Sequence, residues 1–311
     1  MTLGINCTEL CILGRDDMLR VVDDIARFGF KDVRVEIPWR LVEQGNNQWT
    51  WGSTYYAELG ITVAGVEATR DALRARGLTM LPVLGVHNPS WTFTPDDVKD
   101  FATQAAKVLY APEYELWNEV NIHNFIPFGD PKVYAPWYTA ARAGIKSVSP
   151  SAKITTAGLA AAKTYTGITF QWWPPGLIWF GNKSPEDFLT GALAAGVKDF
   201  DYVGYHPYVL GDDFSTQETP RVDHPMIKRI STVAELTKRE PRLTEWGYDY
   251  AKTSPAQAAQ WFKLQLPMLA PYKSYFYCWR DWSAYKFGLV DANNQPRREI
   301  YDAVKLAVAS Q

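Results

Sequence analysis

Short apolar runs alternate with longer amphipathic segments along the whole chain, and this alternation limits the possible folds more than any other feature. The runs show little polar alternation, as expected for strands of a parallel sheet that is covered on both faces. We expect eight strands, at residues 3–6, 33–37, 78–84, 114–117, 153–156, 202–205, 242–244 and 274–279.

The segments between these runs carry helix signals. Thr94 and Ser254 each precede a proline, a pairing typical of a helix N-terminus, and Gly77 is placed to end a helix. Eight strand–helix units predict a single-domain (β/α)8 TIM barrel over residues 1–311. A doubly wound open sheet is the alternative. It is disfavoured because no glycine-rich phosphate fingerprint follows the first strand.

Composition excludes several functional classes. The net charge is −2 and charges of both signs are interspersed, so we expect neither a nucleic-acid partner nor a membrane partner. No run approaches the roughly 18 apolar residues of a membrane span. The three cysteines form no disulfide framework, and the four histidines have no metal-binding spacing. We therefore expect no metal and no cofactor.

Two glutamates stand at the ends of predicted strands. Glu119 closes the segment 114–119, and Glu245 lies within the segment 242–247. An ionisable group at the end of a core strand is costly unless it serves chemistry. Catalytic groups of a barrel gather at the C-terminal strand ends, and glycosidases place two carboxyl groups across the sugar bond. The pair predicts a proton donor and a nucleophile for glycoside hydrolysis.

Aromatic residues are abundant, with 13 Trp, 17 Tyr and 14 Phe. Carbohydrate-binding clefts use flat rings, on which sugars stack, although about half of the tryptophans are expected to pack in the core. Trp172 and Trp173 are candidates for a substrate platform, because adjacent prolines would stiffen the otherwise irregular segment 170–180. Further substrate-binding candidates near strand ends are Arg34, Trp39, His87, Asn118, His206, Tyr208, Trp246 and Trp279.

Four motifs occur in order along the chain: 117–119 (Trp-Asn-Glu), 205–208 (Tyr-His-Pro-Tyr), 244–247 (Thr-Glu-Trp-Gly) and 276–279 (Phe-Tyr-Cys-Trp). With these motifs, the chain resembles the retaining glycoside hydrolases of clan A, which include cellulase-like enzymes and the β-xylosidase/iduronidase family. The resemblance covers nearly the whole chain. One departure is Val120, where many members have proline.

The resemblance implies roles for individual positions. Glu119 would be the general acid/base, and Glu245 the nucleophile, kept ionised by a neighbouring arginine. The other implied roles are a 2-hydroxyl contact for Asn118, a charge partner of Glu245 for Arg34, active-centre contacts for His206 and for Tyr208 near Glu119, and the floor of the −1 subsite for Trp279.

Alternatives stay open at this point. Arg34 could belong to a structural ion pair, and His87 could pack at the barrel mouth. Other acidic residues could replace one of the two glutamates: Glu36, Glu43, Asp130, Asp201 and Asp281. The chain could also be a non-catalytic carbohydrate-binding barrel, whereas a metal-dependent hydrolase lacks suitable ligands. The sugar, the linkage and endo or exo action are not predicted.

Localisation has two interpretations. Residues 1–6 enter a strand directly, without the basic and apolar segments of a secretory signal. The chain would then be a cytoplasmic enzyme acting on imported oligosaccharides. Alternatively, it would be a module of a larger cell-wall-active protein, such as a phage structural or lytic component.

Overall fold

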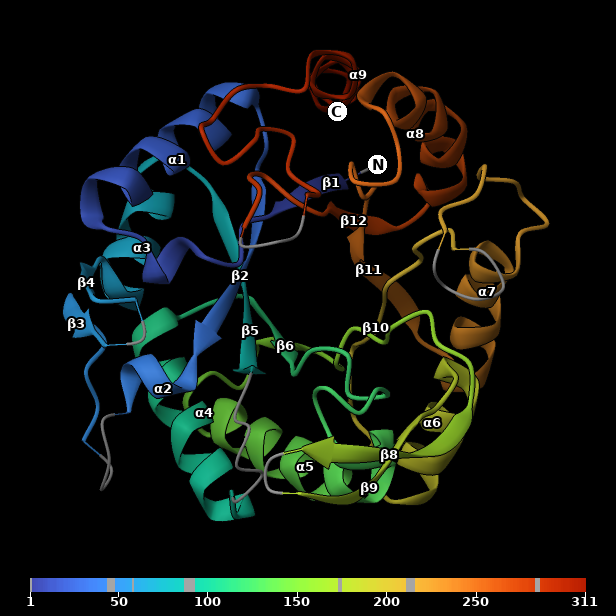
Figure 1. Cartoon of the computed structure of the whole chain (residues 1–311). Coiled ribbons are helices and arrows are strands. Elements are labelled where there is room, and N and C mark those ends of the chain that lie inside the picture. Colours follow the sequence, from blue (N-terminus) through green and yellow to red (C-terminus); the bar gives the residue numbers. More distant parts are fainter. Residues whose placement is uncertain are drawn as a thin grey trace.

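A computed structural model describes residues 2–43, 48–57, 59–86, 93–172, 175–210, 216–282 and 286–311. Eight parallel strands close into a barrel in the order β1-β12-β11-β10-β7-β6-β5-β2 (Figure 1). The predicted (β/α)8 TIM barrel is thereby confirmed. The barrel strands are β1 (Thr2–Asn6), β2 (Asp32–Pro38), β5 (Thr79–Val86), β6 (Glu113–Leu116), β7 (Lys153–Thr155), β10 (Tyr202–Tyr205), β11 (Glu240–Trp246) and β12 (Lys273–Phe276).

Helices surround the barrel (Figure 1). As predicted, Thr94 and Ser254 cap helices by accepting hydrogen bonds from the backbone of Asp97 and Gln257. In the described residues, no helix is both long and apolar enough to cross a membrane. The helices are α1 (Arg15–Phe28), α2 (Trp39–Val42), α3 (Gly65–Ala75), α4 (Pro95–Leu109), α5 (Pro131–Val148), α6 (Pro185–Ala194), α7 (Pro225–Thr237), α8 (Pro255–Leu269) and α9 (Arg298–Ala309), with 3-10 turns η1 (Leu10–Ile12) and η2 (Pro127–Gly129).

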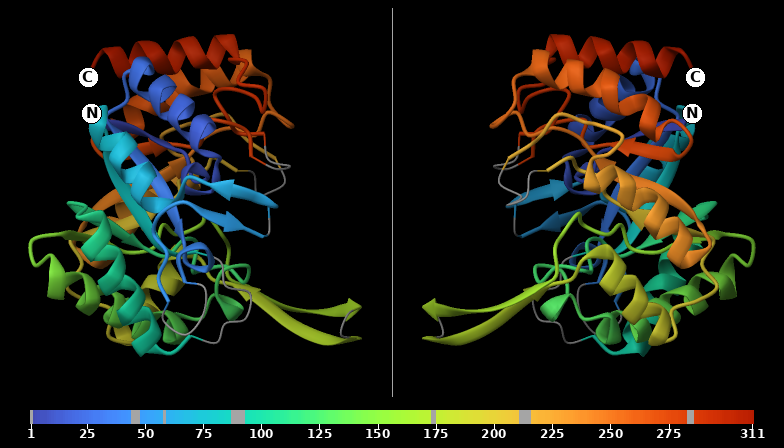
Figure 2. Two further views of the ribbon diagram at one scale, coloured as in Figure 1. Left: turned by 90° about the vertical axis from the view of Figure 1, so that its left-hand side faces the viewer. Right: turned by 90° about the vertical axis from the view of Figure 1, so that its right-hand side faces the viewer.

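Two antiparallel hairpins are added to the barrel, β3 (Thr54–Tyr56) with β4 (Ile61–Val63), and β8 (Tyr165–Trp172) with β9 (Pro175–Asn182). The second hairpin corrects the expectation of an irregular segment at 170–180, because its strands pair in continuous register. Figure 2 shows it projecting from the barrel on the side away from the two chain termini. That side carries the C-terminal ends of the barrel strands, where active sites of this fold lie.

Alternation along the strands separates the barrel interior from the helix layer. On β2, Val33, Val35 and Ile37 are fully buried in the apolar core, whereas Arg34 forms its contacts with polar groups of other barrel strands. This follows from the period of two in a strand, which sends successive side chains to opposite faces. The barrel interior therefore holds charged side chains that the helices never contact.

One irregularity in β11 changes this alternation. Leu243 pairs with Ser274 and Trp246 pairs with Phe276, so three steps along β11 correspond to two along β12. The extra residue is a β-bulge, which turns side chains away from their regular direction. As a result, Thr244 and Glu245 both contact polar groups of the barrel, and Trp246 lies against α8.

Candidate active site

Arg34 organises the polar interior of the barrel. Its guanidinium has five N–H donors, and each has an acceptor. Two bind the carboxylate of Glu115 at 2.6 and 2.9 Å. The other three bind Asn6 at 3.0 Å, Asn118 at 2.8 Å and Glu245 at 2.5 Å. Burial lowers the pKa of Arg34, but the charges of Glu115 and Glu245 outweigh burial and raise that pKa above its usual range.

Glu245 is held by two donors, Arg34 on β2 and Tyr208 in the segment after β10. Its Oε1 accepts from Arg34, and its Oε2 accepts from the hydroxyl of Tyr208 at 3.1 Å. The side chain is almost buried. The structure therefore brings Arg34 and Glu245 together as the resemblance implied, but it corrects the position of Tyr208, whose hydroxyl binds Glu245 rather than Glu119. The two donors hold the carboxylate in a fixed orientation.

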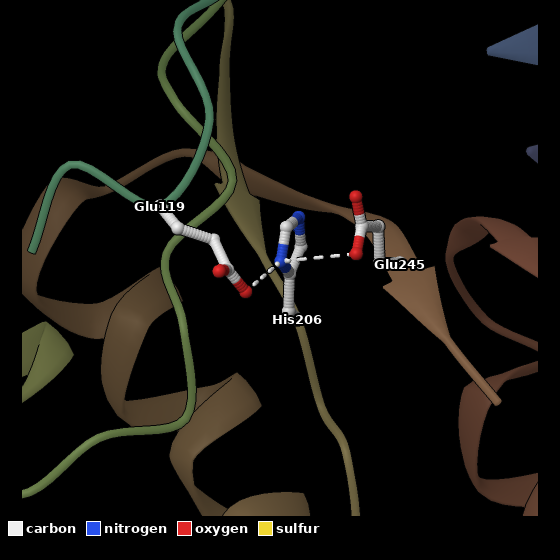
Figure 3. Close-up of side chains that lie close together, drawn as sticks. All are labelled: Glu119, His206 and Glu245. Carbon is white, nitrogen blue, oxygen red and sulfur yellow. Dashed lines mark hydrogen bonds and ion pairs between the residues drawn. The ribbon is translucent and has the colours of Figure 1, made fainter. Parts of the chain in front are cut away.

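Glu119 follows β6 and faces Glu245 across His206 (Figure 3). Its backbone has φ 44°, in the left-handed region, and its N–H binds the carbonyl of Gly158 at 2.8 Å. Nδ1 of His206 lies 3.0 Å from Oε1 of Glu119 and 3.7 Å from Oε2 of Glu245. One carboxylate oxygen of each glutamate and a ring nitrogen of His206 all lie within 4.8 Å of one another.

Gly158 makes room for this arrangement. A Cβ at this position would lie 2.1 Å from Nε2 of His206, 2.4 Å from Oγ1 of Thr244 and 2.8 Å from Oε1 of Glu115. Real Cβ contacts are never this short, and the three groups hold one another by hydrogen bonds. Only glycine therefore allows His206 to pack where it can reach Glu119.

The sequence analysis missed several residues of the site. Asn6 and Glu115 bind Arg34, and Thr244 links His206 to Glu115. The polar residue inside the apolar run of β6 was the available signal for Glu115. Tyr277 follows β12, is partly exposed, and packs edge-on against Phe287, which also contacts Tyr208. Burial raises the pKa of the Tyr277 phenol, and the charge of Glu245 raises it further.

Glu36 adds a third carboxyl group on the inward face of β2, two residues beyond Arg34 toward the mouth. In the described part of the chain, no hydrogen bond or ion pair joins its carboxyl group to another residue. Burial raises its pKa to about 7; the charge of Arg34 opposes this shift, and those of Glu245 and Glu115 add to it. Of the alternative acidic residues, Glu36 is the one whose charge interacts with Arg34, Glu245 and Glu115.

The other acidic alternatives have structural partners away from the site. Glu43 accepts a hydrogen bond from the indole of Trp39. Asp130 caps α5, Asp201 pairs with Lys153, and Asp281 pairs with Arg297 at 2.6 Å. These contacts account for the four carboxylates without any catalytic role.

Three tryptophans predicted to bind substrate pack elsewhere, which corrects the sequence analysis. Trp39 is stacked between Phe93 and Phe101, with ring centroids 4.0 and 4.4 Å away. Trp246 is fully buried and stacks on Phe262 of α8 at 5.6 Å.

Trp279, the third, is buried against Phe28 of α1 and Tyr301 of α9. It lines a cavity of about 260 Å³ beside these helices. The bulge in β11 turns Trp246 outward, whereas Trp39 and Trp279 lie just beyond the ends of β2 and β12.

Three further candidates keep the status of predictions. His87 and Trp173 lie outside the described residues. Trp172 is the last residue of β8, and its substrate-binding role is untested. Asn118 is buried and its side-chain oxygen accepts from Arg34, while its contact with a sugar 2-hydroxyl stays a prediction.

The group formed by Glu119, His206 and Glu245 has a spacing that a cation could bridge. However, the guanidinium of Arg34 already lies 2.5 Å from Glu245 and supplies positive charge there. A second cation beside it would be repelled. The arrangement favours two carboxyl groups beside one guanidinium over a metal site.

Comparisons with known proteins agree with this fold. The sequence matches no protein-family model and no curated protein. Among solved structures, a monomeric β-xylosidase from Caulobacter crescentus CB15 is 17% identical, with a TM-score of 0.67, over 99% of this chain and 68% of that chain. The exo-β-1,4-mannosidase Op5Man5 from Opitutaceae bacterium strain TAV5 is 15% identical, with a TM-score of 0.68, over 100% of this chain and 59% of that chain.

A third solved structure, Thermotoga maritima Cel5A in complex with cellobiose, matches almost end to end. It is 14% identical, with a TM-score of 0.65, and the match covers 97% of both chains. At these identities the likeness shows the fold, the barrel that the chain shares with these three solved structures. The chain spans 68% of the xylosidase and 59% of the mannosidase, so the activities of those two larger proteins are not assigned to it.

Proposed function

We propose that the chain is a retaining O-glycosidase that hydrolyses an oligosaccharide or polysaccharide by double displacement. The observation that carries the proposal is the approach of Glu119 and Glu245, because one carboxylate oxygen of each lies within 4.8 Å of the other. Retaining enzymes hold their carboxyl groups about 5–5.5 Å apart, whereas inverting enzymes need about 6.5–9.5 Å for a water. The short separation supports retention.

The different surroundings of the two glutamates support different roles. Glu245 receives hydrogen bonds from Arg34 and Tyr208, which suit a nucleophile that must be ionised and correctly aimed. Glu119 has the ring of His206 as its hydrogen-bonding neighbour and is more exposed. It would protonate the leaving oxygen as Glu245 attacks the anomeric carbon, and would then activate the water that cleaves the glycosyl-enzyme bond.

The first experiment compares the wild type with Glu245→Gln on aryl glycosides and on plant and bacterial cell-wall polysaccharides. We expect cleavage by the wild type and a loss on the order of 10³-fold or more in the variant. Mass spectrometry of the products identifies the sugar. Proton NMR of the first-formed anomer reports retention or inversion.

Glu235→Gln is the matched control, because Glu235 is exposed on α7, in the helix layer outside the barrel. It should keep full activity. Products of inverted configuration would contradict the double displacement. Binding of a polysaccharide without any cleavage by the wild type would instead favour the second candidate, a non-catalytic carbohydrate-binding barrel.

The substrate pool is also part of the proposal. We propose action on cell-wall polysaccharide, as a module of a larger protein or of a phage particle. Release of soluble fragments from purified bacterial or plant cell walls would support it. Activity restricted to short soluble oligosaccharides would contradict it and favour the alternative of an enzyme for imported sugars.

A further inference from the structure

A line of hydrogen bonds runs from Glu119 into the barrel interior. Oε1 of Glu119 lies 3.0 Å from Nδ1 of His206, and Nε2 of the same ring lies 3.1 Å from Oγ1 of Thr244. That hydroxyl lies 3.1 Å from Oε1 of Glu115. His206, Thr244 and Glu115 are all fully buried, so no water competes for these positions.

The inner end of this line fixes its direction. Glu115 forms an ion pair with Arg34, and its Oε1 also accepts from the backbone N–H of Gly158 at 3.0 Å. This oxygen therefore acts as an acceptor, and the single hydroxyl proton of Thr244 is donated to it. With that proton committed, Oγ1 of Thr244 can only accept from His206, so Nε2 carries a proton.

The proton on Nε2 of His206 determines the state of the other ring nitrogen, Nδ1. In a neutral imidazole only one ring nitrogen carries a proton, and the other is an acceptor. With the proton on Nε2, the lone pair of Nδ1 faces Oε1 of Glu119 at 3.0 Å. Two acceptors at this distance repel each other, so the contact is favourable only when a proton lies between them.

We propose that Thr244 is a positioning residue that fixes the His206 tautomer and thereby keeps the acid proton on Glu119 between turnovers. This rests on the proposed glycosidase function. In the first step the proton moves from Glu119 to the leaving oxygen, as the bond from Glu245 to the anomeric carbon forms and the glycosidic bond breaks. Nδ1 then faces a carboxylate oxygen.

That unfavourable contact strengthens Glu119 as a base for the second step. Water adds its oxygen to the anomeric carbon, the bond to Glu245 breaks, and the proton of the water returns to Glu119. The resting hydrogen bond to Nδ1 is thereby restored. His206 keeps its own proton on Nε2 throughout, so the relay orients the acid without being consumed.

The direct test is the tautomer itself. The chain has four histidines, so protein labelled with 15N-histidine gives few ring signals, and His206 is assigned by its absence in His206→Gln. We expect the wild type to show a neutral ring with the proton on Nε2. A proton on Nδ1, in either a neutral or a doubly protonated ring, would overturn the proposal. This measurement needs no substrate, so it stands even if the proposed glycosidase function fails.

The kinetic test uses Thr244→Val, which keeps the shape and removes the hydroxyl, and Thr244→Ser, which restores it. Aryl glycosides with a dinitrophenyl leaving group need little acid help, whereas phenyl or alkyl glycosides need it fully. We expect Thr244→Val to lose at least about 10-fold in kcat/KM on the poor leaving groups and less than about 2-fold on the good one, within the range of general-acid effects.

Thr244→Ser should restore most of the loss on poor leaving groups. Equal losses of Thr244→Val on both substrate types would show a merely structural role and overturn the proposal. If Thr244→Val does not fold, the ring tautomer of the wild type still tests the proposal, and Thr244→Ser still tests whether a hydroxyl group suffices at this position. Absence of any cleavage by the wild type would reject the glycosidase function, and the ring signals would then judge the hydrogen-bond relay separately.

Discussion

Arg34 and Trp39 lie five residues apart at β2 and α2, and both were predicted to bind substrate, yet they occupy opposite environments. Arg34 holds four polar partners inside the barrel. Trp39 is the middle ring of an aromatic stack outside the barrel, between Phe93 and Phe101. The comparison teaches that a buried charge marks this site better than a surplus of tryptophan does, because aromatic rings also serve packing.

The largest effect should come from Arg34→Met. The variant leaves Glu115 and Glu245 buried without their cation, and removal of one partner from a buried ion pair costs about 3–5 kcal/mol. Urea unfolding measures the loss. Arg76→Met is the control, because its ion pair with Asp23 is partly exposed and screened by water, so its loss should have little effect on stability. Equal losses of unfolding free energy in the two variants would contradict the prediction that the buried Arg34 site contributes more to stability than an exposed ion pair.

Trp39→Ala should separate stability from activity. Loss of the stacked ring costs about 3 kcal/mol or more in unfolding free energy, whereas kcat/KM at a temperature where the variant is folded should stay within about 2-fold. Thermal unfolding and aryl glycoside assays measure the two quantities. A large fall in kcat/KM with intact folding would return Trp39 to the substrate site.

Gly158→Ala adds one methyl group to the polar site inside the barrel. Its Cβ would displace His206 and Thr244, which costs roughly 1–3 kcal/mol as overpacking. Because the displaced groups hold Glu119, activity should fall far more than stability. Gly14→Ala is the control, since a Cβ there meets nothing within 4 Å. A fully active Gly158→Ala would show that the ring of His206 need not be fixed.

The smallest effect is a change in the pH dependence of stability through Glu36. Its pKa is about 7 in the folded chain against an ordinary value of 4.5, so the folded state binds the proton more tightly. Glu36 therefore favours folding below about pH 4.5, and this contribution is lost as the pH rises toward 7. As the pH rises from about 4.5 to about 7, the midpoint of unfolding should fall less for Glu36→Gln than for the wild type. Parallel curves would contradict the shift.

The sequence predicted the barrel and the identity of the two central glutamates from local patterns. Parallel strands that are buried on both faces show as apolar runs, and strand ends show as polar motifs, so both signals are local. Asn6 and Thr244 could not be recognised in the same way, because their roles arise from Arg34 on β2, Glu115 on β6 and His206 beyond β10.

The tryptophans were misassigned for a related reason. Whether Trp246 faces substrate or a helix depends on the bulge in β11, which is a property of pairing with β12 rather than of the sequence around it. The ordered hairpin of β8 and β9 was also missed, since an aromatic and proline-rich run gives no clear period.

The extra residue in β11 decides which of its side chains face the mouth of the barrel. Up to Leu243 the strand keeps step with β12, and after the bulge it is one residue ahead. If the same residues paired with β12 without the bulge, the two directions would be exchanged, so that the indole of Trp246 would face the mouth and the carboxylate of Glu245 would face the apolar layer beside α8. One extra residue in the strand thus decides which of these two adjacent side chains lies at the mouth.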